Sequence, residues 1–349
     1  MVDGIIQSYR VQQYEREDIK LSVLDVCTGA GGEAIGLEAA GFMHEAVVEI
    51  DTAACQTLRL NRPCWRVLEG DIRTVNGLDF RGIDLLAGGV PCPPFTIAGK
   101  QLGADDERDL FPEALRLIEQ AKPAAVMLEN VPGFASEKFV AYRRGLIQSL
   151  HRLGYEVAWR VLNSSDYGVP QLRPRFILVA LHNPYFDNFC WPLSIETPTT
   201  VGQVLHDLMA SRGWQGANQW SQKANGIAPT LVGGSKKHGG PDLGPTRARK
   251  QWEALGVDGR GIADAPPGED FPIDGLPRLT LGMTARIQAF PDNWTFAGGK
   301  TAAYRQIGNA FPPPVSEAVG KAILSALTGQ KQINQESKPS IFQPLLLRP

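Results

Sequence analysis

The sequence predicts an α/β protein built on a doubly wound, mostly parallel sheet, with a smaller and more irregular second domain. Short apolar runs of strand length alternate with stretches of helical spacing between residues 21 and 183, which is typical of such sheets. Glycine-rich or polar segments follow several of these runs, at the edge where open α/β sheets bind ligands. Residues 184–302 are instead rich in Gly, Pro, Trp and Asn, with short strand-like pieces and little helical period.

The composition narrows the class of protein. A chain of 349 residues, 43% hydrophobic and 21% charged, suits a soluble globular protein with one large and one smaller domain. No apolar run approaches the roughly 18 residues of a membrane span, and the first residues lack the sections of a signal peptide. Five cysteines without a CxxC pair argue against a disulfide framework or a zinc site, so we expect no metal and a reducing, cytoplasmic location. A net charge of −2 leaves any nucleic-acid partner to a local positive patch.

The first predicted unit is a strand, a glycine-rich turn and a helix. After a polar leader over residues 1–20, the run Leu21–Val26 indicates a buried strand, and Cys27–Gly32 a turn that opens a helix ending at Gly41. Glycines let backbone N–H groups approach a ligand, and the N-terminus of a helix favours a negative group. A glycine-rich turn alone is a weak indication, since it is often only a tight turn.

Acidic residues end the next two predicted units. The strand Glu45–Ile50 carries Glu49, which lies 20 residues beyond Gly29, the separation at which an acid can take ribose hydroxyls. Asp71 closes a third short unit and could accept a hydrogen bond from an adenine amino group. The turn is GxGG rather than GxGxxG, which favours one nucleoside with an amino-acid tail, such as S-adenosylmethionine, over a dinucleotide. The alternative for each acid is a solvated residue at a strand end.

A cysteine follows the next predicted strand. The apolar run Ile83–Ala87 leads into Gly88–Thr96, so Cys92 lies just past a strand's carboxyl end, in a loop that prolines stiffen. From these residues alone, a nucleophile and a buried cysteine in a Pro-rich loop are equally open. Residues 97–110 carry two glycines and a run of charge that suit a lid over the site, and a helix is predicted at Phe111–Gln120.

A carboxylate follows a further buried strand. Ala124–Leu128 ends in Glu129 and Asn130, which we expect to lie beside Cys92. A carboxylate there would be partly desolvated, which raises its pKa and lets it donate a proton near neutral pH. The alternative is a surface carboxylate that caps the next turn.

Alternating polar side chains precede the last strand of the sheet. Between the predicted strands Tyr155–Leu162 and Phe176–Leu181, the residues Gln171, Arg173 and Arg175 share one face if the segment is extended. Two converging guanidinium groups suit phosphate oxygens or a base carbonyl. A solvated basic edge is the other interpretation.

The second domain carries local positive charge. Residues 201–260 contain eight Lys or Arg and four Asp or Glu, and glycine-rich loops with cations can follow a phosphate backbone and reach base edges. Solvated charged loops are the alternative. A helix is then predicted at Val315–Leu327, and residues 329–349 are expected to form a disordered tail. The candidate substrate contacts of this domain are Thr230, Lys236, Lys237, Arg247 and Arg249.

Taken in order, these motifs resemble those of DNA (cytosine-5) methyltransferases of the bacterial modification type, over residues 21–328. They correspond to the family's cofactor site, nucleophile loop, carboxylate motif, paired arginines, support of the recognition domain and final return to the cofactor pocket. The matching segments are Asp25–Gly32, Glu49, Asp71, Gly89–Cys92, Glu129–Val131, Gln171–Arg175, Arg278–Leu281, Arg286–Pro291 and Gln306–Pro313.

The resemblance implies a Rossmann-like class I S-adenosylmethionine-dependent methyltransferase fold. Residues 21–183, completed by 303–328, would form the catalytic and cofactor-binding domain, and residues 184–302 the target-recognition domain. S-adenosylmethionine is the implied cofactor. The implied cofactor contacts are Asp25, Cys27, Thr28, Gly29, Gly31, Gly32, Glu49, Ile50, Asp71, Ile72, Pro91, Leu110 and Asn309.

The resemblance also implies a reaction. Cys92 would add to carbon 6 of a cytosine flipped out of duplex DNA, while Glu129 stabilises the ring and Arg175 holds the base carbonyl. Arg173 would lie nearby on a phosphate or the carboxylate, and Gln171 would contact the substrate. The implied protein is a bacterial, nucleoid-associated monomer that protects DNA in a restriction-modification system.

Two positions depart from the family's pattern, and two other functions stay open. Cys27 stands where the family often has a Phe against the adenine, and Pro93 where it commonly has a Gln after the cysteine, so both contacts should differ. A transfer-RNA cytosine-5 methyltransferase could use the same scaffold, although such enzymes usually lack a long recognition domain. A catalytically dead DNA-binding regulator is the third possibility, although it has no need of Cys92, Glu129 and Arg175 together.

Overall fold

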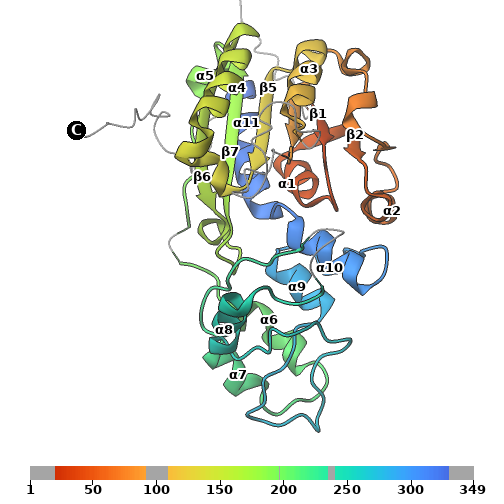
Figure 1. The fold of residues 1–349 in the computed structure, drawn as a ribbon, viewed down its shortest axis with the longest axis vertical. Coiled ribbons are helices and arrows are strands. Elements are labelled where there is room, and N and C mark those ends of the chain that lie inside the picture. The colour runs from red at the N-terminus through yellow and green to blue at the C-terminus, as the bar shows by residue number, and fades with distance from the viewer. Residues whose placement is uncertain (1–19, 92–108, 196, 235–239, 330–349) are drawn as a thin grey trace, which may run out of the picture.

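Two lobes of unequal size make up the computed structural model, which describes residues 20–91, 109–195, 197–234 and 240–329. Figure 1 shows a sheet flanked by helices in the larger lobe, and below it a smaller lobe of short helices and irregular segments. Within the described ranges, every helix is too short or too polar to span a lipid bilayer.

The larger lobe is built on a seven-stranded sheet in the order β3-β2-β1-β4-β5-β7-β6. Neighbouring strands from β3 to β5 are parallel, and β7 pairs antiparallel with both β5 and β6. The predicted doubly wound, mostly parallel sheet is therefore confirmed, with strand ends shifted by a few residues. The strands are β1 (Leu21–Val26), β2 (Phe42–Glu49), β3 (Val67–Glu69), β4 (Leu85–Gly88), β5 (Ala125–Asn130), β6 (Tyr155–Asn163) and β7 (Pro174–His182).

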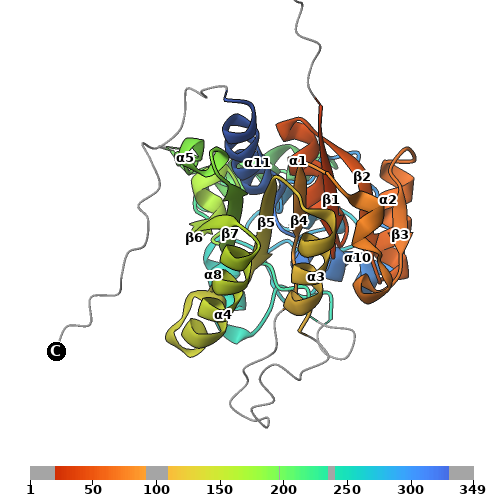
Figure 2. The same cartoon turned by 90° about the horizontal axis from the view of Figure 1, so that it is seen from above.

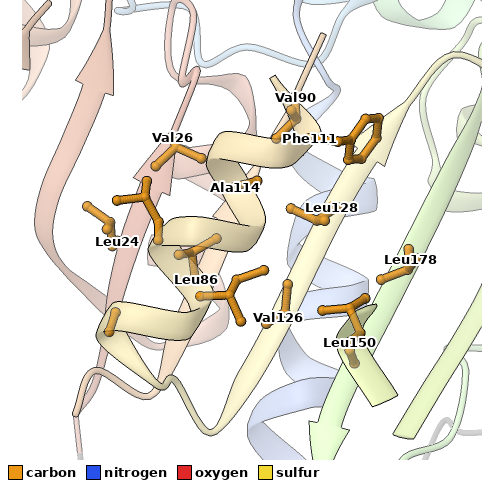
Figure 3. Close-up of a cluster of buried hydrophobic side chains, with 14 of the residues drawn as sticks. Leu24, Val26, Leu86, Val90, Phe111, Ala114, Val126, Leu128, Leu150 and Leu178 are labelled. Carbon is orange, nitrogen blue, oxygen red and sulfur yellow. The ribbon is translucent and has the colours of Figure 1, made fainter. Parts of the chain in front are cut away.

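One face of the sheet packs against α3 (Phe111–Ala121) and α4 (Val140–Arg152). Figure 3 shows this cluster, in which strand side chains such as Leu86 and Val126 meet Ala114 of α3. Because successive strand residues point to opposite faces, the intervening side chains are free to build a second core behind the sheet.

That second core lies under α1 (Gly32–Ala40), α5 (Tyr185–Asn188) and α11 (Pro313–Thr328), on the opposite face in Figure 2. The helices α1 and α11 approach so closely that a Cβ atom at Gly36 would collide with the backbone of Pro313. The first and last described helices therefore lie side by side, and the helix predicted near the end of the chain is confirmed.

The smaller lobe is helical where the sequence predicted short strand-like pieces. Past β7, the described residues contain isolated bridges but no strand. Helices of seven residues, such as α7 (Ala217–Lys223) and α9 (Leu281–Ile287), are too short to show a clear period, and they pack around buried tryptophans such as Trp220 and Trp252. The larger lobe also extends past the expected boundary at residue 184, because α5 packs on β7 and α11.

The remaining elements are short. Helix α2 (Thr52–Asn61) connects β2 to β3. The helices of the smaller lobe are α6 (Val201–Ala210), α7 (Ala217–Lys223), α8 (Thr246–Ala254), α9 (Leu281–Ile287) and α10 (Lys300–Asn309). Single turns of 3₁₀ helix are η1 (Ile72–Thr74), η2 (Gly77–Phe80), η4 (Pro132–Ala135), η5 (Glu137–Phe139) and η6 (Ser164–Tyr167).

Candidate active site

A cavity of about 500 Å³ opens at the carboxyl ends of β1, β2, β4 and β5. The strand order reverses between β1 and β4, and ligands bind at such switch points. Its volume falls in the range of small-molecule sites. Eleven of the predicted residues line it, together with Glu33 and Arg305, which the sequence reasoning missed. The eleven are Cys27, Thr28, Gly29, Glu49, Ile50, Asp71, Ile72, Pro91, Leu110, Glu129 and Asn309.

The glycine-rich turn between β1 and α1 has positive φ angles, which glycine adopts easily and most other residues do not. Gly29 and Gly31 have φ angles of 59° and 92°, and Cys27 adopts the same left-handed region at 56°. Burial and the neighbouring carboxylates raise the pKa of the Cys27 thiol, which is therefore neutral. Gly32 has no room for a side chain, because a Cβ atom there would collide with the backbone of Phe311. Gly31 and Gly32 thus shape the turn from behind the cavity wall.

Glu49 is fixed on the cavity wall by backbone donors. Its Oε2 accepts a hydrogen bond from Gly29 N at 2.7 Å, and its Oε1 accepts from Ile50 N at 2.8 Å and Asp51 N at 2.7 Å. The carboxylate therefore joins the glycine turn to the end of β2. Beside it the Ile50 side chain is 65% exposed, which leaves an apolar surface over the cavity.

Asp71 lies further along the same wall. Its carboxylate caps η1 by accepting from Arg73 N at 2.9 Å and pairs with the Arg73 guanidinium at 2.9 Å, and both interactions lower its pKa. The group is thus a fixed, ionised acceptor next to Ile72.

Asp25 lies behind the turn rather than on the cavity wall. It is fully buried, with Oδ1 accepting from the Thr28 hydroxyl at 2.9 Å and Oδ2 lacking a partner among the described residues. Burial raises the pKa of Asp25 to about 8, and the charge of Glu49 adds to this, while the Thr28 hydrogen bond opposes it. Its part in the turn is thus to position Thr28.

Glu129 and Arg175 form a buried ion pair at the far end of the cavity. Arg175 Nε lies 2.8 Å from Glu129 Oε1, and the two side chains are 11% and 14% exposed. Burial raises the pKa of Glu129, against the opposing charges of Arg175 and Arg173. The predicted desolvated carboxylate is therefore present. Arg175 itself is outside the cavity lining and acts here through Glu129.

The start of the nucleophile loop is hydrogen-bonded to β5, the strand that carries Glu129. Asn130 Nδ2 donates to Val90 O at 2.8 Å, and Leu110 N donates to Pro91 O at 3.3 Å. Cys92 and Pro93 lie outside the described residues, as does the lid expected at residues 97–110 except for its last two positions. The positions that flank this segment, Pro91 and Leu110, both line the cavity.

Gln171 and Arg173 lie outside the cavity lining. Gln171 is 0% exposed and pairs with Gln288 and Leu231 N, while Arg173 is 1% exposed and donates to Leu231 O at 2.7 Å and Gly308 O at 2.8 Å. Both side chains thus connect the segment before β7 to residues of the smaller lobe and α10, and neither lines the cavity. In this structure Gln171 is engaged by the Gln288 side chain and Leu231 N, and Arg173 by two backbone carbonyls, while the charge of Arg173 still acts on Glu129. The contact of Gln171 with substrate and that of Arg173 with a phosphate or the carboxylate stay predictions.

The predicted substrate contacts of the smaller lobe are spread out. The Thr230 hydroxyl donates to Leu172 O, and Arg247 is exposed on α8. The Arg249 side chain points back toward the N-terminus of α8, where its Nε donates to Gly244 O at 2.7 Å. It therefore supports the loop before α8. Lys236 and Lys237 lie outside the described residues.

Three cavity residues come from α10, namely Arg305, Gln306 and Asn309. Asn309 Nδ2 donates to Gly234 O at 3.1 Å, and Arg305 lies 3.8 Å from Asp51 Oδ2. Arg305 follows no motif in the sequence, so only the docking of α10 against α2 and its N-cap Asp51 reveals it. Among the described residues, no group of three or more His, Cys, Asp or Glu side chains could hold a metal ion.

The chain is similar in sequence to DNA methyltransferases. The family model of C-5 cytosine-specific DNA methylases matches residues 21–325. The Type II methyltransferase M.NaeI of Lentzea aerocolonigenes is 53% identical over 93% of this chain and 80% of its own length. The Type II methyltransferase M.NgoMIV of Neisseria gonorrhoeae is 54% identical over 88% of this chain and 99% of its own length.

Solved structures share the fold at low sequence identity. A putative DNA modification methyltransferase encoded within a prophage of E. coli has a TM-score of 0.63 and 23% identity, over 88% of this chain and 100% of that one. DNMT2 of Spodoptera frugiperda, as a triple mutant, has a TM-score of 0.61 and 19% identity, over 87% of this chain and 100% of that one. The expected class I S-adenosylmethionine-dependent methyltransferase fold is therefore confirmed.

Proposed function

Since the chain belongs to the C-5 cytosine-specific DNA methylase family and is a DNA cytosine-5 methyltransferase, we propose that its reaction proceeds through a covalent adduct between Cys92 and a cytosine turned out of duplex DNA. The observation that carries this proposal is the ion pair between Glu129 on β5 and Arg175 on β7. The residue after Glu129, Asn130, donates a hydrogen bond to Val90 O at the start of the Cys92 loop.

The residues of the cavity fit S-adenosylmethionine. Glu49 is held by three backbone N–H groups with its carboxylate on the cavity wall, where it can accept from ribose hydroxyls, and Ile50 and Asp71 suit the face and amino group of an adenine. The N-terminus of α1 has no side-chain cap, which suits the carboxylate of the amino-acid end. When bound, S-adenosylmethionine supplies the electrophilic methyl group.

Three side chains then act on the base. A Cys92 thiolate forms a bond to carbon 6, which makes carbon 5 nucleophilic. Glu129, whose pKa is raised by burial, gives a proton or hydrogen bond to ring nitrogen N3, and Arg175 keeps Glu129 in place and reaches the base carbonyl. After methylation, loss of the carbon-5 proton breaks the sulfur–carbon bond and frees Cys92.

The smaller lobe suits recognition of the DNA sequence. Arg247, Thr230 and the lysines Lys236 and Lys237 are its candidate contacts, and domain limits of 21–183 with 303–328 and 184–302 remain our proposal apart from α5. We propose that the enzyme acts as a monomer.

The relatives suggest the biological setting. M.NaeI and M.NgoMIV are named Type II methyltransferases, so we propose that this enzyme protects DNA in a restriction-modification system, in the cytoplasm with the DNA that it modifies. A transfer-RNA enzyme and a catalytically dead regulator are not favoured, since these relatives share more than half of their aligned residues with the chain.

Trapping of the adduct tests the proposal. Duplex DNA with 5-fluorocytosine at the target should form a stable covalent complex with the parent protein and S-adenosylmethionine, whereas Cys92→Ala should form none and transfer no labelled methyl group. Cys64→Ala is the matched control, because Cys64 is an exposed free cysteine outside the cavity, and it should behave as the parent. Methylation retained by Cys92→Ala would refute the role of Cys92.

A further inference from the structure

Glu33 is a buried acid that none of the proposed roles uses. It lies in the first turn of α1, is 4% exposed and lines the cavity. Its Oε1 atom has no hydrogen-bond partner within the described part of the chain. Since a buried carboxyl group that lacks partners is costly, a side chain of this kind that lines a cavity indicates a ligand group that pairs with it.

The position of Glu33 is at the junction of the two halves of the site. A Cβ atom built on Gly89 would lie 3.9 Å from Glu33 Oε2 and 3.2 Å from Glu129 Oε2, so the two carboxyls approach the same point beyond β4. The acids suited to adenosine, Glu49 and Asp71, instead belong to the ends of β2 and β3. Glu33 therefore faces the end of the cavity nearest the reacting base.

The charges around Glu33 favour a cation. Asp25 on β1 and Glu129 on β5 add to burial in raising the pKa of Glu33 well above its ordinary value. The helix α11 contributes only a neutral group there, the Ser316 hydroxyl, which donates to Glu33 O at 2.7 Å. Arg175 is engaged by Glu129, so within the described ranges no cation pairs with Glu33.

Resting on the proposed function, we infer that the Glu33 carboxylate accepts a hydrogen bond from the α-ammonium group of S-adenosylmethionine. The ammonium and carboxylate of the amino-acid end share one carbon, and the N-terminus of α1 that suits the carboxylate carries Glu33 in its first turn. Because Oε1 is shielded, the hydrogen bond goes to Oε2, the oxygen that lies nearer to Gly89 on the cavity lining, and a charge-assisted bond of this kind offsets the cost of burying the carboxylate. Because burial favours the protonated acid at neutral pH, forming the ion pair transfers the Glu33 proton to solvent.

Ligand binding without turnover tests this contact. By calorimetry, Glu33→Gln should lower the affinity for S-adenosylmethionine and S-adenosylhomocysteine by about 10- to 100-fold, and leave the affinity for 5′-methylthioadenosine, which lacks the amino-acid end, within about two-fold. Glu49→Gln should weaken all three ligands. Glu38→Gln is the matched control on the same helix, since Glu38 pairs with Arg62 away from the cavity, and it should bind like the parent.

Proton release gives a second measurement. Calorimetry of S-adenosylhomocysteine binding in buffers of different ionisation enthalpy should show proton release by the parent at pH 7 and less by Glu33→Gln. Unchanged affinity in Glu33→Gln, an equal loss for 5′-methylthioadenosine, or a loss for S-adenosylmethionine alone would overturn the ammonium contact. Failure of the parent to bind any of these ligands would instead refute the proposed cofactor.

Discussion

The two lobes shift the pKa values of several of their carboxyl groups in opposite directions. In and behind the cavity wall of the larger lobe, Asp25, Glu33 and Glu129 are shielded from solvent, and burial is the largest cause of their raised pKa values. In the smaller lobe, Asp207 and Asp258 pair with arginines near the surface, and these pairs lower their pKa values. The paired acids favour the folded state, whereas the cavity acids are held in a state that disfavours their charge.

This difference distinguishes acids that suit ligand binding or proton transfer from acids that stabilise the fold. Two of these acids, Glu33 in the cavity lining and Asp25 behind the glycine turn, have a buried oxygen without a partner among the described residues, which costs stability. Such groups cluster where a protein binds charged ligands or moves protons. The acids of the smaller lobe instead connect segments, as Asp258 does between Arg260 and Arg278.

The largest expected effect is on catalysis. Glu129→Gln keeps the shape of the side chain but removes its proton chemistry, so methylation of duplex DNA should fall at least about 100-fold while affinity for S-adenosylhomocysteine stays near that of the parent. Glu156→Gln, at an exposed site on β6, is the matched control for activity. A Glu129→Gln enzyme with near-parental turnover would break the contrast between the lobes.

The next effect is on the pH dependence of stability. Asp25 has a folded pKa of about 8 against an ordinary value of 3.8, so the protonated form stabilises the ligand-free protein at low pH, and stability falls as pH rises through about 8. Asp25→Asn keeps an acceptor for the Thr28 hydroxyl and removes this titration. Its melting temperature relative to the parent should therefore rise by several degrees between pH 6 and pH 8.5 in calorimetric scans. A constant difference across that range would show that Asp25 does not titrate there.

The smallest effect has the opposite sign. The Asp258 pKa is lowered by Arg260 and Arg278, so its contribution is present above its ordinary value of 3.8 and is lost as pH falls below it. Both arginines are largely exposed, so Asp258→Asn should cost less than about 1 kcal/mol at pH 7. Denaturant unfolding at low and high salt measures this, with a smaller cost expected at high salt. A cost several times larger would mean that the pair is effectively buried.

Local patterns in the sequence predicted the larger lobe well. Apolar runs marked the strands, and the glycine turn marked the start of α1, because these features depend on neighbouring residues alone. The same logic placed Glu129 and Glu49 at strand ends that line one cavity. The helices of the smaller lobe escaped prediction because they are too short to show a period.

Roles that depend on distant contacts could not be predicted in this way. Arg173 alternates with Arg175 in the sequence, yet its hydrogen bonds reach residues 58 and 135 positions away, which no local pattern reports. Glu33 lies in the first turn of a helix, where an acid is usually solvated. It is buried because α11 packs against α1 and closes the other side.

The joining of α1 to α11 has a consequence for synthesis of the protein. The cavity needs Thr28 and Gly29 from the first strand–turn unit, and Asn309 to Phe311 from the segment that leads into α11. The ribosome makes β1 first and α11 last among the described elements. A nascent or truncated polypeptide that ends before Asn309 therefore lacks part of the cavity wall, which is complete only once translation has nearly reached α11.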